Sequence, residues 1–253
     1  MDPITTAETN SDYCNEDQLM EMLCDRIHGK TIPLSDDELV VAVGSLPPLS
    51  HEREFMTALM FYHGIGTAKS LEDARLIMTE SADGGFQEAQ YTLAEGYQYG
   101  LFGKKDIFRA AKYYRKAADQ RDICASLRFA EICIEIYQET KIEFFADEAL
   151  NELWDKAYGC DEANLMLAKC YLRGTAGEIS YETAKEQIDY LEDIGYDVSS
   201  LRKEYARSVS KNNSGKVEPV SFGPDDLDEL LDSASELTTI RQRHLASYLR
   251  RTE

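Results

Sequence analysis

Residues 89–120, AQYTLAEGYQYGLFGKKDIFRAAKYYRKAADQ, decide the fold because their pattern of small, aromatic and glycine residues recurs in the chain. The pattern is carried by Ala89, Leu93, Ala94, Tyr97, Gly100, Ala110 and Ala118. Thirty-six residues earlier stand Arg53, Thr57, Ala58, Phe61, Gly64, Ala74 and Ala82. Seventy-four residues later stand Ala163, Leu167, Ala168, Tyr171, Gly174, Ala184 and Glu192. A fixed period of about 20 to 50 residues is typical of repeat proteins.

Four repeats follow from this spacing, at about 52–88, 87–120, 124–161 and 162–197. The third lacks both loop glycines and is longer by about two residues, since the offset from the second to the fourth is 74 rather than 72. Helical periodicity predicts helices over 87–99 and 107–120 in the second repeat. Strand-type alternation is missing throughout, so we expect an all-α fold of antiparallel helix pairs.

The repeats resemble the Sel1-like repeat, a relative of the tetratricopeptide repeat. The resemblance rests on "AQYTLAEGYQYG…DIFRAAKYYRKAADQ" in the second repeat and "YHGIG…LEDARLIMTESADGG" in the first, and it covers about residues 52–198. It implies a right-handed α-solenoid with a protein-binding concave face, often in bacterial signalling, secretion or toxin-related systems. A cysteine-rich branch of the family staples each helix pair with a disulfide. Here Cys124, Cys133, Cys160 and Cys170 do not repeat at that branch's positions.

Flanking segments complete the predicted organisation. Residues 12–50 form an N-terminal helical lead-in, with Asn15 as an N-cap and a second helix starting at Ser35. The solenoid occupies 52–207 with a C-terminal cap helix, and 208–223 is a linker rich in Gly, Asn and Ser. Residues 224–251 are a C-terminal helical segment with Leu227, Leu230 and Leu231 in one stripe. This segment either caps the solenoid or lies in its groove.

The net charge of the chain indicates which classes of partner it would bind. The 253 residues carry a formal net charge of −20, which argues against nucleic-acid binding and against an anionic membrane surface. The charge either favours a basic protein partner or only keeps the surface solvated. Residues 101–128 reverse the sign, and this basic island suits an acidic segment, including one of the chain's own.

A cytoplasmic location is expected. Residues 1–11 are polar and lack the basic and apolar regions of a secretory signal, and no run of about 18 apolar residues would span a membrane. None of the six cysteines forms a CxxC pair, which is typical of a reduced protein without a zinc site.

Catalytic patterns are missing, so we expect no enzyme, cofactor or metal. "GIGTAKS" lacks P-loop spacing, "HEREF" lacks the second histidine of a metalloprotease, and "DDLDELLD" lacks the glycine of a calcium loop. The four histidines are scattered.

The expected binding site is the concave groove, lined by the first helix of each pair. By analogy with tetratricopeptide domains, four positions in each repeat face it. They are Phe55, Leu59, Tyr62 and His63; Tyr91, Glu95, Gln98 and Tyr99; Leu127, Glu131, Ile134 and Glu135; and Leu165, Lys169, Leu172 and Arg173. Their side chains suit an amphipathic helix or an extended peptide, unless half of them pack between repeats.

These features predict a non-catalytic scaffold or adaptor that captures a segment of another protein in this groove. The alternative is an inhibitor or immunity-type protein that binds and blocks a toxin or enzyme. The sequence makes no prediction of oligomeric state.

Overall fold

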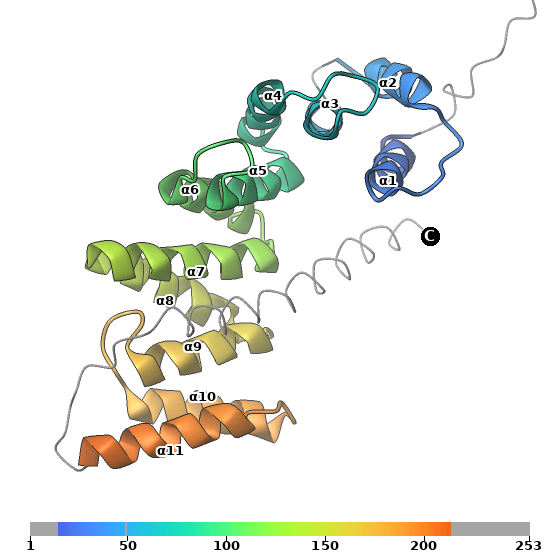
Figure 1. Cartoon of the computed structure of the whole chain (residues 1–253). Helices are drawn as coiled ribbons and strands as arrows, with labels where there is room; N and C mark the ends of the chain where they lie inside the picture. Colours follow the sequence, from blue (N-terminus) through green and yellow to red (C-terminus); the bar gives the residue numbers. More distant parts are fainter. Residues whose placement is uncertain (1–14, 49, 214–253) are drawn as a thin grey trace, which may run out of the picture. The chain divides into compact units, whose positions relative to one another are not determined.

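All regular structure in residues 15–48 and 50–213, the part that the computed structural model describes, is α-helical (Figure 1). Eleven helices lie in this part, and the all-α prediction is confirmed for it. They are α1 (Glu16–Ile27), α2 (Asp36–Ser45), α3 (His51–His63), α4 (Leu71–Asp83), α5 (Gln87–Tyr99), α6 (Ile107–Ala118), α7 (Ile123–Thr140), α8 (Glu143–Ala157), α9 (Asp161–Arg173), α10 (Tyr181–Asp193) and α11 (Ser199–Asn213).

The described helices fall into two compact units, with α1 to α5 in the first and α6 to α11 in the second. Consecutive helices pack as pairs, α3 on α4, α7 on α8 and α9 on α10. We call α3–α4, α5–α6, α7–α8 and α9–α10 repeats one to four. We call their first members A helices and their second members B helices. The right-handed course and the concave face implied by the resemblance stay predictions.

The lead-in helices of the first unit begin at capping boxes. The Asn15 side chain accepts a hydrogen bond from the Gln18 backbone, and the Gln18 side chain accepts one from the Asn15 backbone. Ser35 and Glu38 do the same at α2. Both predicted helix starts are therefore confirmed, and the reason is that each cap satisfies backbone N–H groups that the first turn leaves without partners.

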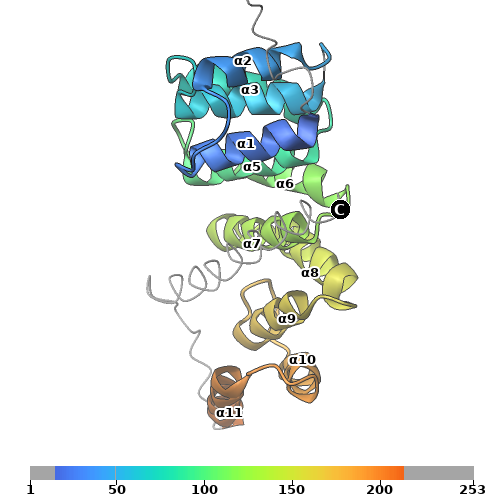
Figure 2. The ribbon, with the colours of Figure 1, turned by 90° about the vertical axis from the view of Figure 1, so that its right-hand side faces the viewer.

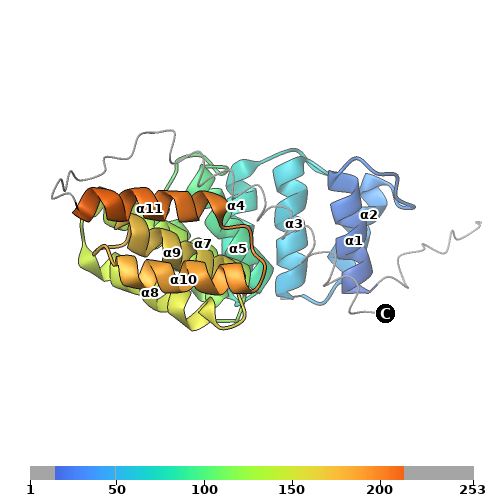
Figure 3. The same ribbon diagram turned by 90° about the horizontal axis from the view of Figure 1, so that it is seen from below.

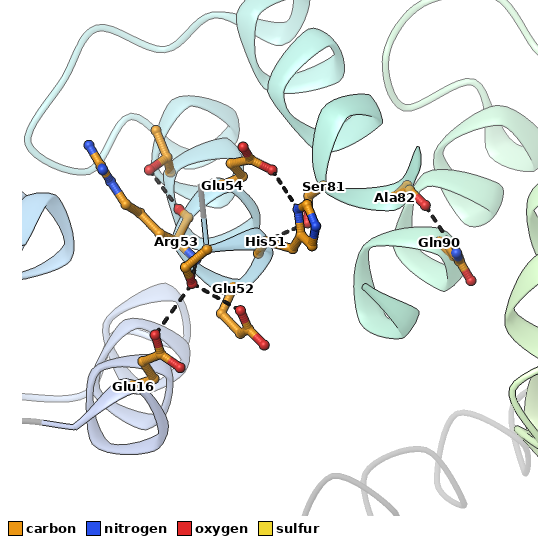
Figure 4. A network of polar contacts seen from close by, with 10 residues as sticks. Glu16, His51, Glu52, Arg53, Glu54, Ser81, Ala82 and Gln90 are labelled. Carbon is orange, nitrogen blue, oxygen red and sulfur yellow. Dashed lines mark hydrogen bonds and ion pairs between the residues drawn. The ribbon is translucent and has the colours of Figure 1, made fainter. Parts of the chain in front are cut away.

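A shared core and a polar network join the lead-in helices to repeat one (Figure 2). Leu19, Leu39 and Met56, from α1, α2 and α3, are buried in one cluster. Ser50, the N-cap of α3, donates to Glu16 of α1 at 3.3 Å. Ser81 of α4 donates to the His51 carbonyl of α3 at 2.6 Å (Figure 4). The lead-in is thus part of the same packed unit as repeat one.

Three of the four A helices end in the same way. The helices α3, α5 and α9 each have 13 residues and stop at Gly64, Gly100 and Gly174, whose φ angles of 77°, 68° and 68° are left-handed. Glycine takes this conformation without steric cost. A seven-residue loop begins at each glycine, and one backbone hydrogen bond of 2.9 Å closes it. The bonds run from Ser70 to Phe61, from Asp106 to Tyr97 and from Ser180 to Tyr171.

Repeat three is built differently. Ile136 stands where the other repeats have their glycine, and it is fully buried in α7. A β-branched residue disfavours the left-handed conformation, so the helix continues to Thr140. Lys141, with a φ of 57°, then ends α7, and α8 begins after Ile142. A longer helix and a two-residue turn replace the loop.

The last helices share a core that contains Leu172, Ile188 and Leu201 from α9, α10 and α11. Figure 3 shows α11 lying along α9 and α10, as expected for a cap helix. The helix runs to Asn213, so residues 208–213 are helical rather than linker. The remaining predicted linker and the 224–251 segment lie outside the described residues.

Candidate functional site

Four of the sixteen predicted groove residues belong to the core rather than to a binding surface. Phe55, Tyr91, Leu127 and Leu172 are buried. The first three occupy the same position in consecutive A helices, and the ring of Phe55 packs edge-on against Phe86 at 5.3 Å. This is a correction to the predicted site, because a buried side chain offers no surface to a partner.

The other twelve remain accessible to different degrees. His63 and Tyr99 are exposed, and ten are half-buried: Leu59, Tyr62, Glu95, Gln98, Glu131, Ile134, Glu135, Leu165, Lys169 and Arg173. Leu59 and Leu165 pack against the cores of their own units.

In the first unit, the accessible residues gather around Tyr62 of α3. Its ring has edge contacts with His63 at 5.0 Å and with Phe102, in the loop after α5, at 5.7 Å. The Lys69 ammonium lies over the same ring, 5.3 Å from its centroid. This cluster offers an aromatic and cationic surface, which suits an apolar or aromatic side chain of a partner.

In the second unit, the accessible residues form charged rows on neighbouring A helices. On α7, Glu131 accepts a hydrogen bond of 2.8 Å from Arg128, whose side chain is buried. On α9, Arg173 makes a bidentate ion pair with Glu204 of α11, with distances of 2.8 and 2.9 Å. Such forked pairs fix side-chain geometry as well as charge.

Lys169 on α9 is the exception in these rows. Within the described part of the chain, its ammonium makes no hydrogen bond and no ion pair. Burial lowers the pKa of Lys169, and the nearby Arg173 lowers it further, whereas Glu204 and Glu131 raise it. A largely desolvated charge without a partner is unfavourable, which makes it a candidate for contact with an incoming carboxylate.

The two rows carry opposite charge at equivalent positions. α7 begins at Ile123 and α9 at Asp161, 38 residues later, so Glu131 corresponds to Lys169 and Glu135 to Arg173. The structure therefore brings an acidic row and a basic row onto adjacent helices.

A polar contact at the junctions between repeats was not predicted from the sequence. The side-chain amide of Gln90 donates to the Ala82 carbonyl at 3.0 Å, as Figure 4 shows. Its equivalent in repeat four, Asn164, donates to the carbonyls of Ala157 and Cys160 at 2.7 and 3.1 Å. The recurrence of an amide side chain at an offset of 74 residues was the available signal.

Among the described residues, no group of three or more His, Cys, Asp or Glu side chains could hold a metal ion. Burial raises the pKa of the Cys133 thiol to about 12 and that of Cys170 to about 11, so both stay protonated and unreactive. No helix in the described ranges has the length and apolar character needed to cross a membrane.

Comparison with known proteins identifies the repeats. The family model of the Sel1 repeat matches residues 54–86, 87–122 and 161–186. An uncharacterized protein of Neisseria meningitidis serogroup B is 29% identical over 123 residues, which are 49% of this chain and 25% of that protein. The chain thus spans about a quarter of that relative's length.

Two solved structures are similar. The crystal structure of a Sel1 repeat protein from Oxalobacter formigenes has a TM-score of 0.44 and 20% identity, over 79% of this chain and 84% of that one. A protective antigen of uropathogenic Escherichia coli with an SLR fold has a TM-score of 0.38 and 18% identity, over 71% of this chain and 46% of that one. With the matched segments, the sequence and the helix pairs in agreement, the chain contains three Sel1 repeats, and α7 and α8 lie between the second and the third.

Proposed function

We propose that the protein is a non-catalytic scaffold or adaptor that captures a segment of a partner protein on its A helices. Sel1 repeat proteins are in general scaffolds for protein interactions, and the repeat fold is typically non-catalytic. The observation that carries the proposal for this chain is the half-buried ammonium of Lys169, which makes no hydrogen bond or ion pair among the described residues and lies near Glu131 of α7 and Glu204 of α11.

The charged rows define what the captured segment would supply. Lys169 on α9 offers an ammonium to an acidic side chain, and Glu131 and Glu135 of α7, which already have partners of their own, make the neighbouring row acidic. The net charge of −20 would accelerate the approach of a partner that is basic overall. We therefore propose a basic partner whose bound segment also carries an acidic residue. The buried thiols suit a reducing compartment, so we place this interaction in the cytoplasm.

The test is affinity purification from the native cell with the full-length protein. We expect Glu135→Lys with Lys169→Glu to reduce the recovered partner by about tenfold or more, since charge reversal in a partly desolvated contact costs several kcal/mol. The matched control is Glu182→Lys with Lys185→Glu, which makes the same exchange on α10, a B helix. Circular dichroism and melting curves must show that both variants fold.

Equal recovery with both variants would contradict binding at the charged rows. The recovered partner also distinguishes the alternative function, an inhibitor, from a scaffold or adaptor. If the recovered partner is a toxin or an enzyme and loses activity when this protein is added, the protein is an inhibitor. If its activity is unchanged, the protein is a scaffold or adaptor.

A further inference from the structure

The last described helix, α11, has the residue pattern of an A helix. Counted from the first residue of each helix, the eighth residue is a fully buried alanine in all four A helices: Ala58, Ala94, Ala130 and Ala168. The eighth residue of α11 is also an alanine, Ala206, but it is exposed. Each of the four A helices is followed by a B helix that begins 20 residues after it, whereas the structure describes no helix after α11.

The α9–α10 pair shows what covers this alanine in a complete repeat. Ala168 lies in one core cluster with Ala184, Ile188 and Leu191, which are the fourth, eighth and eleventh residues of α10. The same positions of the other B helices are small or apolar, as Ala74, Met78 and Ser81; Ala110, Tyr114 and Ala117; and Ala146, Leu150 and Leu153. An exposed alanine at this position of α11 therefore indicates that a B helix belongs there.

The opposite requirement, a further A helix beyond α11, is not indicated. The fifth residue of each A helix is apolar, and in α3 this residue, Phe55, packs on Phe86 at the start of the next repeat. The fifth residue of α11 is Lys203, which is exposed. A polar outer face is typical of the repeat that ends an array. The pattern thus identifies α11 as the A helix of a terminal fifth repeat.

The chain carries a matching B-helix pattern after α11. In a helix that begins at Pro224, the fourth, eighth and eleventh residues are Leu227, Leu231 and Ala234, which is the spacing of the three core residues of α10. The other residues from 225 to 232 are acidic, except for one more leucine at the seventh position. Proline is tolerated at the start of a helix, and acidic residues in its first turn complement the helix dipole.

The connection between the two segments is long enough for an antiparallel pair. Pro224 lies 25 residues after Ser199, the first residue of α11, compared with 20 residues in the other repeats. The five additional residues lengthen only the loop, which then includes residues 214–223. Because the entropic cost of closing a loop grows slowly with its length, this extension hardly disfavours the pairing.

We propose that residues 224–236 form the B helix of a fifth repeat and pack on α11 of the same chain. Leu227 and Leu231 lie against Ala206, as Ala184 and Ile188 lie with Ala168 in repeat four. The loop keeps the segment at an effective concentration on the order of millimolar, which favours it over a segment of another molecule.

The fifth repeat extends the A-helix surface of the second unit. Arg207 and Lys211 are the ninth and thirteenth residues of α11, the positions that Lys169 and Arg173 hold in α9. A B helix on α11 would therefore hold a second basic row in place beside that of α9. The inference itself rests on the residue pattern of α11 and is tested without a partner, so its failure would leave the proposed function intact.

Hydrogen exchange of the full-length protein tests the pairing. Amides 228–235 lie beyond the first turn of the proposed helix, so their hydrogen bonds lie within it. We expect these amides to exchange at least about tenfold more slowly than in an unstructured peptide of the same sequence. Leu227→Asp with Leu231→Asp should return them to the unstructured rate. The matched control, Leu245→Asp with Leu249→Asp, makes the same change outside the segment and should leave them protected.

Ala206→Arg tests the position on α11 without changing the segment. On an uncovered helix this substitution is neutral because Ala206 is exposed, and an arginine does not repel acidic residues. We expect the protection of amides 228–235 to be lost in Ala206→Arg. It should be kept in Ser200→Arg, which adds the same side chain at an exposed position on another face of α11. Unchanged exchange in α9 and α10 shows that the repeats remain folded.

Three results would overturn the proposal. The first is exchange of amides 228–235 at the unstructured rate in the native protein. The second is protection that survives Ala206→Arg, because the segment would then pack somewhere other than on α11. The third is protection that appears only as the protein concentration rises, since a segment of a second copy would then be the occupant.

Discussion

Repeats three and four lie next to each other in the second unit and use the same seven positions in opposite ways. In repeat four, residues 174–180 form a loop that begins at the left-handed Gly174. In repeat three, residues 136–142 add five helical residues to α7 and then turn at Lys141 and Ile142. Both α8 and α10 begin after the same number of residues. The comparison indicates that the residue at the glycine position influences the local structure. The number of residues from the start of the A helix to the start of the B helix is the same in both repeats.

The largest expected effect on stability tests whether the cores of repeats three and four contribute equally to the free energy of unfolding. Leu153 in α8 and Leu191 in α10 are equivalent and fully buried. We expect Leu153→Ala and Leu191→Ala each to lower the free energy of unfolding by about 2 to 5 kcal/mol, the usual cost of a buried Leu→Ala cavity. Urea denaturation measures both losses. A clearly smaller loss for Leu153→Ala would mean that the altered repeat is loosely packed.

The next effect concerns the junctions that precede each A helix. Asn164 donates to two carbonyls, whereas its equivalent in repeat three, Ser126, has a buried hydroxyl without a partner among the described residues. Asn164→Ala should cost about 1 to 3 kcal/mol, because it removes two side-chain hydrogen bonds and takes the amide donor from the Ala157 carbonyl. Ser126→Ala should be neutral or slightly stabilising, since it removes an unsatisfied hydroxyl. Equal losses in denaturation curves would show that the polar contact does not distinguish the junctions.

Substitutions at the two left-handed residues should have opposite signs. In Gly174→Ala the new Cβ would lie 2.8 Å from the Ile179 side chain, and the backbone is strained for any L-residue, so we expect a loss of about 1 to 2 kcal/mol. Lys141→Gly relieves the strain at a φ of 57° and should raise stability by up to about 1 kcal/mol. Thermal melting compares the two, and a gain from Gly174→Ala would refute the role given to the glycine.

The smallest expected effect on stability distinguishes the basic row on α9 from the acidic row on α7. Lys169→Met should raise the free energy of unfolding by about 1 kcal/mol at neutral pH, because it removes an unpaired desolvated charge. The equivalent Glu131→Met should lower the free energy of unfolding by a similar amount, since it removes one carboxylate partner of the buried Arg128. Losses in both variants would show that Lys169 is favourably placed even without a partner.

The pH dependence of Lys169→Met supplies a second measurement. The ordinary lysine pKa is 10.5, and burial lowers it in the folded protein. The cost of the charged form is therefore fully present at neutral pH and disappears as the pH rises from the folded-state pKa toward 10.5. The advantage of Lys169→Met over the native protein should shrink across this alkaline range. A constant difference would assign the effect to packing.

Helix boundaries were predictable wherever a backbone rule applies. The spacing predicts 87–99, which is α5, because Gly100 can take the left-handed conformation that ends a helix. The predicted 107–120 helix ends two residues earlier, at Ala118. The missing glycines of repeat three were visible, but the extension of α7 followed from Ile136, which the periodicity alone does not separate from any other buried residue.

The candidate site was less predictable from the sequence, because the burial of each side chain depends on the helix that packs beside it. The position of Phe55, Tyr91 and Leu127 is aromatic or aliphatic in every repeat, which is the signature of a core position, and it is buried in these three. Leu172 gave no such signal, since its equivalents in the other repeats include the polar Gln98. That Lys169 makes no ion pair could not be predicted from the sequence, because it depends on which side chains surround its ammonium in the folded protein.

The matched seven-residue length of 136–142 and 174–180 has an evolutionary consequence. Repeats three and four differ over these positions between a helical extension and a surface loop without an insertion or deletion, so α8 and α10 begin at equivalent positions. Such an exchange lets one member of a tandem array diverge and acquire a new surface while its neighbours are conserved in structure. Residues 136–142 and 174–180 can therefore be exchanged between repeats three and four without changing the length of the chain.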